Sequence, residues 1–110
     1  MKTMIRYTVL VGALAGGLTV LAADAKENWD KECAKCHGAD GKGQTRMGRQ
    51  SGAKDYTDVK VQAEMDDAKA VVRIKEGLKE GGKEKMKGYG DKFSEDELKA
   101  LVAHMRTFKK

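Results

Sequence analysis

Five consecutive residues, Cys33-Ala34-Lys35-Cys36-His37, constrain this chain more than any other part of its sequence. Two thiols three positions apart, followed directly by an imidazole, form the pattern by which haem is attached to protein. The two sulfurs can add across the two vinyl groups of one haem, and the adjacent histidine then lies under the iron. The motif predicts one covalently attached haem c, held by Cys33 and Cys36, with His37 as the proximal iron ligand.

Cysteine pairs also occur in other kinds of site, which the sequence supports less well. A zinc finger needs four ligands at finger spacing, but this chain has two cysteines, and His104 lies far from them. A thioredoxin-like redox pair follows a strand of a βαβ unit, and no strand pattern precedes Cys33. A haem-free structural domain with a Cys33–Cys36 disulfide stays open as an alternative.

The N-terminal quarter of the chain has the features of an export signal. Two basic residues precede an uncharged stretch over residues 7–23, and Ala23-Asp24-Ala25 has the small-x-small form of a cleavage site. We expect a cleavable secretory signal peptide over residues 1–25, then a soluble periplasmic domain over residues 26–110 with no stable membrane insertion. An uncleaved anchor is the alternative, because about 17 residues is the lower limit for a membrane span.

The composition of the mature part agrees with a small haem domain. Its length suffices for one domain with only a small core. The aromatic side chains after residue 25 are few: Trp29, Tyr56, Tyr89, Phe93 and Phe108. A buried haem would supply apolar bulk, so we expect the apoprotein to fold poorly. The full chain has a net charge of +5 at pH 7, but basic and acidic residues interleave, which argues against nucleic-acid binding.

The residues around the cysteine motif predict a short first helix. Asn28 can cap it, and Trp29, Cys33 and Cys36 then share one face at positions i, i+4 and i+7. The helix should end near the histidine of the motif, because three glycines follow within six residues. We expect residues 38–54 to form a loop.

Three further helices are expected, of which the last has the clearest signal. The first begins at Thr57 or Asp58 and continues to Ala63. The second begins with Asp66 or Asp67 as its cap and ends at Gly81-Gly82. Gly77 inside the second helix lowers the stability of that helix relative to alanine. The close approach of a bulky group would explain why a glycine stands there.

A glycine- and lysine-rich loop then covers residues 81–92. Ser94-Glu95-Asp96-Glu97 has the form of a capping box and predicts the start of the last helix. The apolar face of that helix consists of Leu98, Leu101, Val102, Met105 and Phe108.

A second axial ligand would complete a six-coordinate haem iron. Met86 is favoured, because it stands in a glycine-flanked loop 49 residues after His37, far enough for the chain to pass round the haem. Met47 lies only ten residues after His37, so the short loop between them would have to pass around the haem edge. His104 lies in the last turn of a helix, where histidine commonly interacts with the helix dipole. Met47 and His104 stay open as alternatives. Two other methionines are assigned to core packing: Met65 and Met105.

These features together resemble a small bacterial class I cytochrome c. The resemblance is carried by the cysteine motif with Gly38 after it, the Ile74-x-x-Gly77 pair, Met86 and the final amphipathic helix, and it spans the mature domain. It implies an all-α fold, in which three to four short helices wrap around one haem and the first and last helices cross. It also implies thioethers at both cysteines, with His37 and Met86 as axial ligands.

The sequence departs from the family pattern at two points. The distal segment reads Met86-Lys87-Gly88-Tyr89-Gly90, with lysine where the family often has proline, which predicts a less rigid loop. The chain contains no proline, so the sequence does not identify the carbonyl that would accept the ring N–H of His37.

Axial ligation by His37 and Met86 would leave single-electron transfer as the remaining chemistry, because no position on the iron is free for a substrate. We therefore expect a monomeric electron carrier with redox protein partners, not an enzyme. Lysines near the distal methionine (Lys83, Lys85 and Lys87) favour acidic docking surfaces on those partners. A haem enzyme or gas sensor with an open or labile distal site is the alternative, although the sequence offers it no distal acid–base pair.

Overall fold

The computed structural model describes residues 14–110. Its elements are α1 (Leu14–Asn28), η1 (Trp29–Cys33, a π-helical turn), α2 (Ala34–His37), α3 (Arg46–Ser51), α4 (Val59–Glu64), α5 (Asp67–Glu76), β1 (Leu78–Glu80), β2 (Lys83–Met86) and α6 (Glu95–Arg106). The fold is predominantly helical, as predicted, with one short antiparallel hairpin of β1 and β2 within the described part of the chain.

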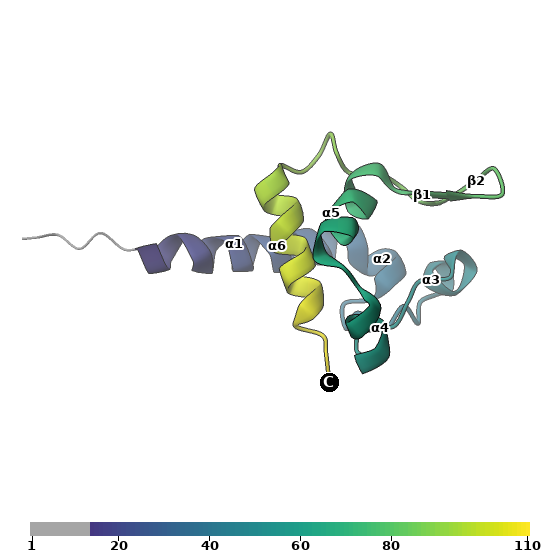
Figure 1. Cartoon of the computed structure of the whole chain (residues 1–110), viewed down its shortest axis with the longest axis horizontal. Helices are drawn as coiled ribbons and strands as arrows, with labels where there is room; N and C mark the ends of the chain where they lie inside the picture. The colour runs from purple at the N-terminus through teal and green to yellow at the C-terminus, as the bar shows by residue number, and fades with distance from the viewer. Residues whose placement is uncertain (1–13) are drawn as a thin grey trace, which may run out of the picture.

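The helix that carries the cysteine motif is longer than predicted. Asn28 has helical dihedral angles (φ −62°, ψ −40°) and makes no capping hydrogen bond, so the predicted start at Asn28 is wrong. The reason is that the preceding residues are helical too, and α1, η1 and α2 follow one another without a break (Figure 1). The predicted end is confirmed, because Gly38 leaves the helical region with φ 80°.

Part of the predicted signal peptide lies outside the described residues, namely residues 1–13. The remainder forms the first turns of α1, where Ala25 is 2% exposed. Across residues 14–110, no helix combines the length and the apolar character that a membrane span requires.

The core lies where α6 crosses α1 and η1 (Figure 1). Trp29, Leu98 and Leu101 are the largest fully buried side chains, and Val102 and Met105 of α6 are buried beside them. The predicted apolar face of the last helix is therefore confirmed, except that Phe108 follows the end of α6 and is only partly buried.

The capping signals before three helices are confirmed. The Ser94 hydroxyl accepts from the Glu97 backbone N–H at 3.2 Å, and the Glu97 carboxylate accepts from the Ser94 N–H at 3.0 Å. Asp58 caps α4 through the Lys60 N–H, and Asp66 caps α5 through the Lys69 N–H. Each side chain partners a backbone N–H that the helix itself leaves free.

Two boundaries in the middle of the chain differ from the prediction. α5 ends at Gly77 rather than at Gly81-Gly82, because Gly77 takes φ 78°, and Leu78 begins β1 instead of the next helical turn. The predicted loop over residues 38–54 contains α3, which Thr45 caps by accepting from the Gly48 N–H at 2.9 Å.

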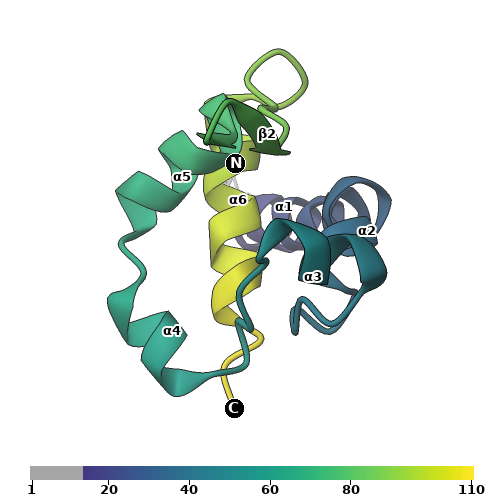
Figure 2. The same ribbon diagram turned by 90° about the vertical axis from the view of Figure 1, so that its right-hand side faces the viewer.

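Viewed end-on, the segments after the cysteine motif follow a ring. Figure 2 shows α3, α4, α5 and the hairpin succeeding one another around α6. Arg106 of α6 fixes the junction of α4 and α5, because it donates to the Met65 carbonyl at 2.6 Å and pairs with Asp67 at 2.8 Å. The ring brings the hairpin back toward the helix that carries the cysteines.

We predict that Leu101→Ala lowers the free energy of unfolding of the haem-loaded protein by about 2–5 kcal/mol, because it opens a cavity at a fully buried position. Guanidinium titration followed by circular dichroism measures the change. The matched control is Val72→Ala on α5, where the side chain is 48% exposed and the expected change is within about 0.5 kcal/mol. Equal effects of the two substitutions would contradict this assignment of the core.

Candidate functional site

The backbone at the end of the cysteine motif is held by hydrogen bonds from two side chains and from the loop that follows. The Cys36 carbonyl accepts from the Thr45 hydroxyl at 2.7 Å, and the His37 carbonyl accepts from the Gly43 N–H at 2.8 Å. The Gly38 carbonyl accepts from the Trp29 ring N–H at 2.9 Å. Three successive carbonyls at a helix end thus have partners, which fixes the direction in which the motif presents its side chains.

The His37 imidazole packs against two aromatic rings, which also contact each other. Its centroid is 5.5 Å from that of Trp29 and 5.6 Å from that of Tyr56. Its Nδ1 atom is buried and has no hydrogen-bond partner among the described residues. Burial lowers the pKa of His37, which favours the neutral form that binds metals.

The two cysteines are free thiols in different environments. Cys33 is buried among Trp29, Ile74 and the apolar face of α6, whereas Cys36 is half-buried. Burial, and then the neighbouring Glu32 carboxylate, raise the pKa of Cys33 to about 12.

Met86 reaches the same apolar cluster from the far end of the ring. It is the last residue of β2, pairs with Leu78 across the hairpin, and packs partly buried against the cluster that contains Cys33. The structure therefore brings together Cys33 and Met86, which are distant in the sequence.

The distal segment is also tied to the helix of the cysteine motif. The Tyr89 hydroxyl donates to the Glu32 carbonyl at 3.2 Å, and Lys92 forms an ion pair with the Glu32 side chain. Tyr89 stacks on Phe93, with 5.8 Å between the ring centroids. These contacts anchor the chain just after Met86 beside Cys33.

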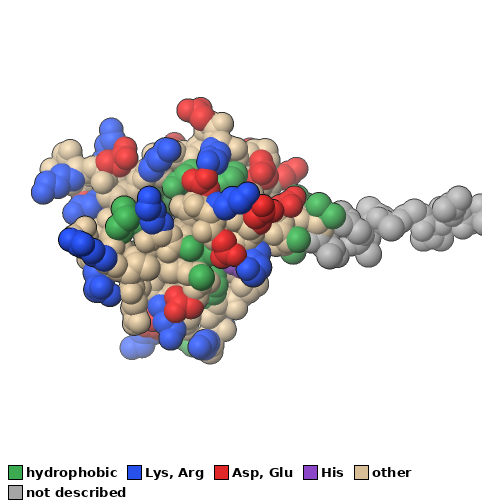
Figure 3. All heavy atoms as spheres, turned by 180° about the vertical axis from the view of Figure 1, so that it is seen from behind, with side chains coloured by type: hydrophobic (Ala, Val, Ile, Leu, Met, Phe, Trp, Pro, Cys, Tyr) green, Lys and Arg blue, Asp and Glu red, His purple; other side chains and the backbone are tan. Residues whose placement is uncertain are grey.

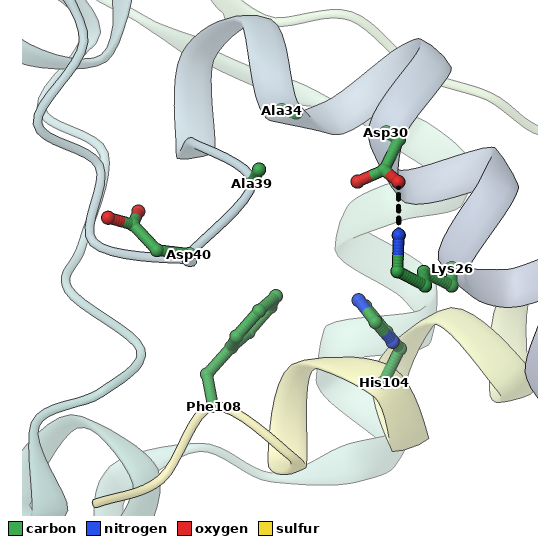
Figure 4. Close-up of a pocket in the computed structure, with 7 residues that line it drawn as sticks. All are labelled: Lys26, Asp30, Ala34, Ala39, Asp40, His104 and Phe108. Carbon is green, nitrogen blue, oxygen red and sulfur yellow. Dashed lines mark hydrogen bonds and ion pairs between the residues drawn. The ribbon is translucent and has the colours of Figure 1, made fainter.

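The two alternative ligand candidates, Met47 and His104, belong to α3 and α6. Met47 is 45% exposed on α3. His104 lines a groove with Lys26, Asp30 and Phe108 (Figure 4), and its ring centroid is 5.7 Å from that of Trp29. Met105 is buried in the core and Met65 packs against it, as the sequence predicted.

A small helical fold whose first helix ends in Cys-x-x-Cys-His defines a c-type cytochrome. The cytochrome c family model matches residues 22–109, and the chain therefore belongs to the cytochrome c family, as a small class I member. None of the curated proteins matches it.

Two solved structures are similar to the chain over most of its length. One is the KustC0563 c-type cytochrome, which is 32% identical, with a TM-score of 0.68 over 78% of this chain and 98% of that one. The other is a tyrosine-to-phenylalanine mutant of Kustc0563, 34% identical, with a TM-score of 0.69 over 78% and 99%. The predicted fold class is thereby confirmed.

Family membership establishes that the protein binds covalently attached haem c and acts in haem-based electron transfer. The residues around the motif fit this group. Within residues 14–110, the buried Nδ1 atom of His37 has no hydrogen-bond partner, and the thiols of Cys33 and Cys36 are not joined to each other. Aromatic and thioether side chains that stay partly exposed line the same cluster: Tyr56, Met65, Met86, Tyr89 and Phe108.

The sequence does not single out the residues of α3 and its cap that support the cysteine motif. Thr45 lies in a predicted loop, although threonine is a common N-cap residue. Gly48 gave no local signal, because its role depends on a distant contact. A Cβ at Gly48 would lie 2.2 Å from the Cys36 carbonyl oxygen, so glycine lets α3 approach the motif.

We predict that Thr45→Val destabilises the haem-loaded protein by about 1–3 kcal/mol, because the Cys36 carbonyl and the Gly48 N–H both lose a partner. Thr45→Ser keeps the hydroxyl and should stay within about 0.5 kcal/mol of the parent protein. Guanidinium unfolding of the ferric protein measures both. Equal stability of the valine and serine variants would show that the hydroxyl does not hold the motif.

Proposed function

We propose that this protein is a periplasmic electron carrier whose haem c is attached through Cys33 and Cys36 and ligated by His37 and Met86. The observation that carries the proposal is the convergence of Met86 and the cysteine motif on one apolar cluster. The buried, unpartnered ring nitrogen of His37 beside the two thiols supports the proximal half of the site. Residues 1–25 are the export signal in this proposal, and cleavage leaves the domain that begins at Lys26.

The bound haem supplies one-electron redox chemistry at its iron, and two protein ligands leave no position there for a substrate. The chain's own residues hold the axial ligands in position and bury the site. Trp29 and Tyr56 both pack against the His37 ring and hold it in place, and burial lowers the pKa of His37, which favours the neutral imidazole. Met86 offers a thioether, a soft neutral donor that favours the ferrous state.

The arrangement of charge supports a docking face for acidic redox partners. Figure 3 shows Lys and Arg side chains gathered at the end of the molecule remote from α1, with Asp and Glu denser toward α1. α3 and the β1–β2 hairpin lie at this end (Figure 1). We call their exposed basic residues, with Lys87 directly after β2, the basic end: Arg46, Arg49, Lys79, Lys83 and Lys87. Residues 41–54, which include α3, contain no Asp or Glu. Because Met86 ends the hairpin that carries Lys83, an acidic partner attracted to the basic end would meet the distal side of the site.

Axial ligation is tested by Met86→Ala. We expect the parent protein to show low-spin spectra, a far-red sulfur–iron band and no reaction with CO. The variant should lose the band, bind CO and have a lower reduction potential. Met47→Ala is the control, because this exposed methionine lies outside the cluster, and it should leave all three properties unchanged. A parent protein that is high-spin and binds CO would overturn the proposal in favour of catalysis or gas sensing.

Docking is tested with charged one-electron oxidants of the reduced protein. Oxidation by anionic hexacyanoferrate(III) should slow with rising ionic strength, and slow further in the double variant Lys83→Glu, Lys87→Glu. Oxidation by the cationic tris(phenanthroline)cobalt(III) should respond in the opposite direction. The double variant Lys99→Glu, Lys109→Glu changes the net charge equally away from the basic end and should have a smaller effect. Equal effects of the two double variants would remove the basic end as a docking face.

A further inference from the structure

The segment that carries Met86 packs on the end of α5 backbone against backbone. The Tyr89 N–H donates to the Ile74 carbonyl at 2.9 Å, and the Gly90 N–H donates to the Lys75 carbonyl at 3.0 Å. These carbonyls belong to the last turn of α5, where they have no partner within the helix. The distal segment therefore completes the end of α5, and its position depends on how closely the two backbones approach.

Two glycines make that approach possible. A Cβ at Gly77 would lie 2.4 Å from the Met86 carbonyl oxygen and 2.6 Å from the Gly88 nitrogen. A Cβ at Gly88 would lie 2.8 Å from both carbonyl atoms of Glu76. All these contacts are with backbone atoms, which cannot rotate away as the end of a side chain can. A methyl group at either position would thus push the two segments apart.

We infer that Gly77 and Gly88 are positioning residues for Met86, and we call the pair the glycine clamp. The inference rests on the proposed function, in which Met86 is an iron ligand. A Cβ at Gly77 would meet the Met86 carbonyl itself, so a displacement there moves the residue that carries the sulfur. Lys87 of this segment stands where the family often has proline. Close packing at the glycine clamp holds the segment in place, so it is rigid without a proline ring.

The same hairpin contains a matched control. Gly82 has φ 77°, nearly the same as the 78° of Gly77, but no atom of the described residues lies within 4 Å of the position that its Cβ would take. Gly82→Ala therefore introduces the backbone strain without the collision. Gly88 is outside the positive-φ region, so Gly88→Ala introduces the collision without the strain. Gly77→Ala introduces both.

The experiment compares these three variants as haem-loaded proteins. The readouts are the far-red sulfur–iron band, the reduction potential, and the rate of CO binding to the reduced protein. In Gly77→Ala and Gly88→Ala we expect a weakened band, a lower potential and CO binding accelerated by about tenfold or more, because the fraction with Met86 off the iron rises. Gly82→Ala should match the parent in all three.

A denaturant titration separates positioning from general stability. In Gly88→Ala the band should disappear at a lower guanidinium concentration than the helical circular dichroism signal, whereas in Gly82→Ala the two should disappear together, as in the parent. If Gly77→Ala and Gly88→Ala yield no haem-loaded protein, Gly90→Ala takes their place. Its Cβ would meet the Lys75 side chain at 3.1 Å and the Lys75 carbonyl oxygen at 3.2 Å, a milder collision on the same segment.

The outcomes distinguish this inference from the proposed function. A parent protein without the band, or Met86→Ala with unchanged spectra, would overturn the ligand assignment itself. A parent with the band, lost in Met86→Ala but kept in the clamp variants with unchanged potential and CO rate, would overturn the clamp alone. Equal effects of Gly88→Ala and Gly82→Ala would also overturn it, because backbone collision would then have no special role.

Discussion

The packing of Trp29 against the C-terminal part of α6 is the contact on which the rest of the structure depends. The indole is 2% exposed and lies within 6 Å, between ring centroids, of His37, His104 and Phe108. Its N–H also binds the Gly38 carbonyl, just past the cysteine motif. One side chain thus joins the core between α1 and α6 to the backbone of the site. The direction in which the motif points is therefore set by the same burial that stabilises the fold.

The two halves of the site are held by different physical means. On the side of the cysteines, side-chain and loop groups satisfy the carbonyls at the end of α2, with Thr45 and Gly43 as donors. On the side of Met86, the segment packs on α5 backbone against backbone, and the side chains of Tyr89 and Lys92 link it to Glu32. Glycine is required for a different reason at each half of the site. Gly38 ends a helix by its dihedral angles, whereas Gly88 matters because a Cβ would not fit.

Local signals predicted the helices well where a side chain acts on its own helix. The caps at Asp58, Asp66 and Ser94 each act on a backbone N–H two or three residues away, so the sequence contains the whole interaction. The errors have the opposite character. Asn28 can cap a helix only if the chain before it is not helical, and here it is. Gly77 is predicted inside a helix, with a bulky group close to it. In the structure Gly77 ends that helix, and the group close to it is the backbone of the Met86 segment.

The sequence by itself determined the chemistry: two thiols and an imidazole at fixed spacing predict a covalent haem, because a haem presents two vinyl groups and one iron to any chain that carries this motif. It also determined the apolar face of α6, since helical periodicity is local. Only the tertiary structure decided that Met86 packs against the cluster of Cys33, how α3 supports Cys36, and why Gly77 and Gly88 lack side chains. Each of these depends on contacts between residues far apart in the chain, and such contacts leave no periodic or spacing signal for the sequence alone to display.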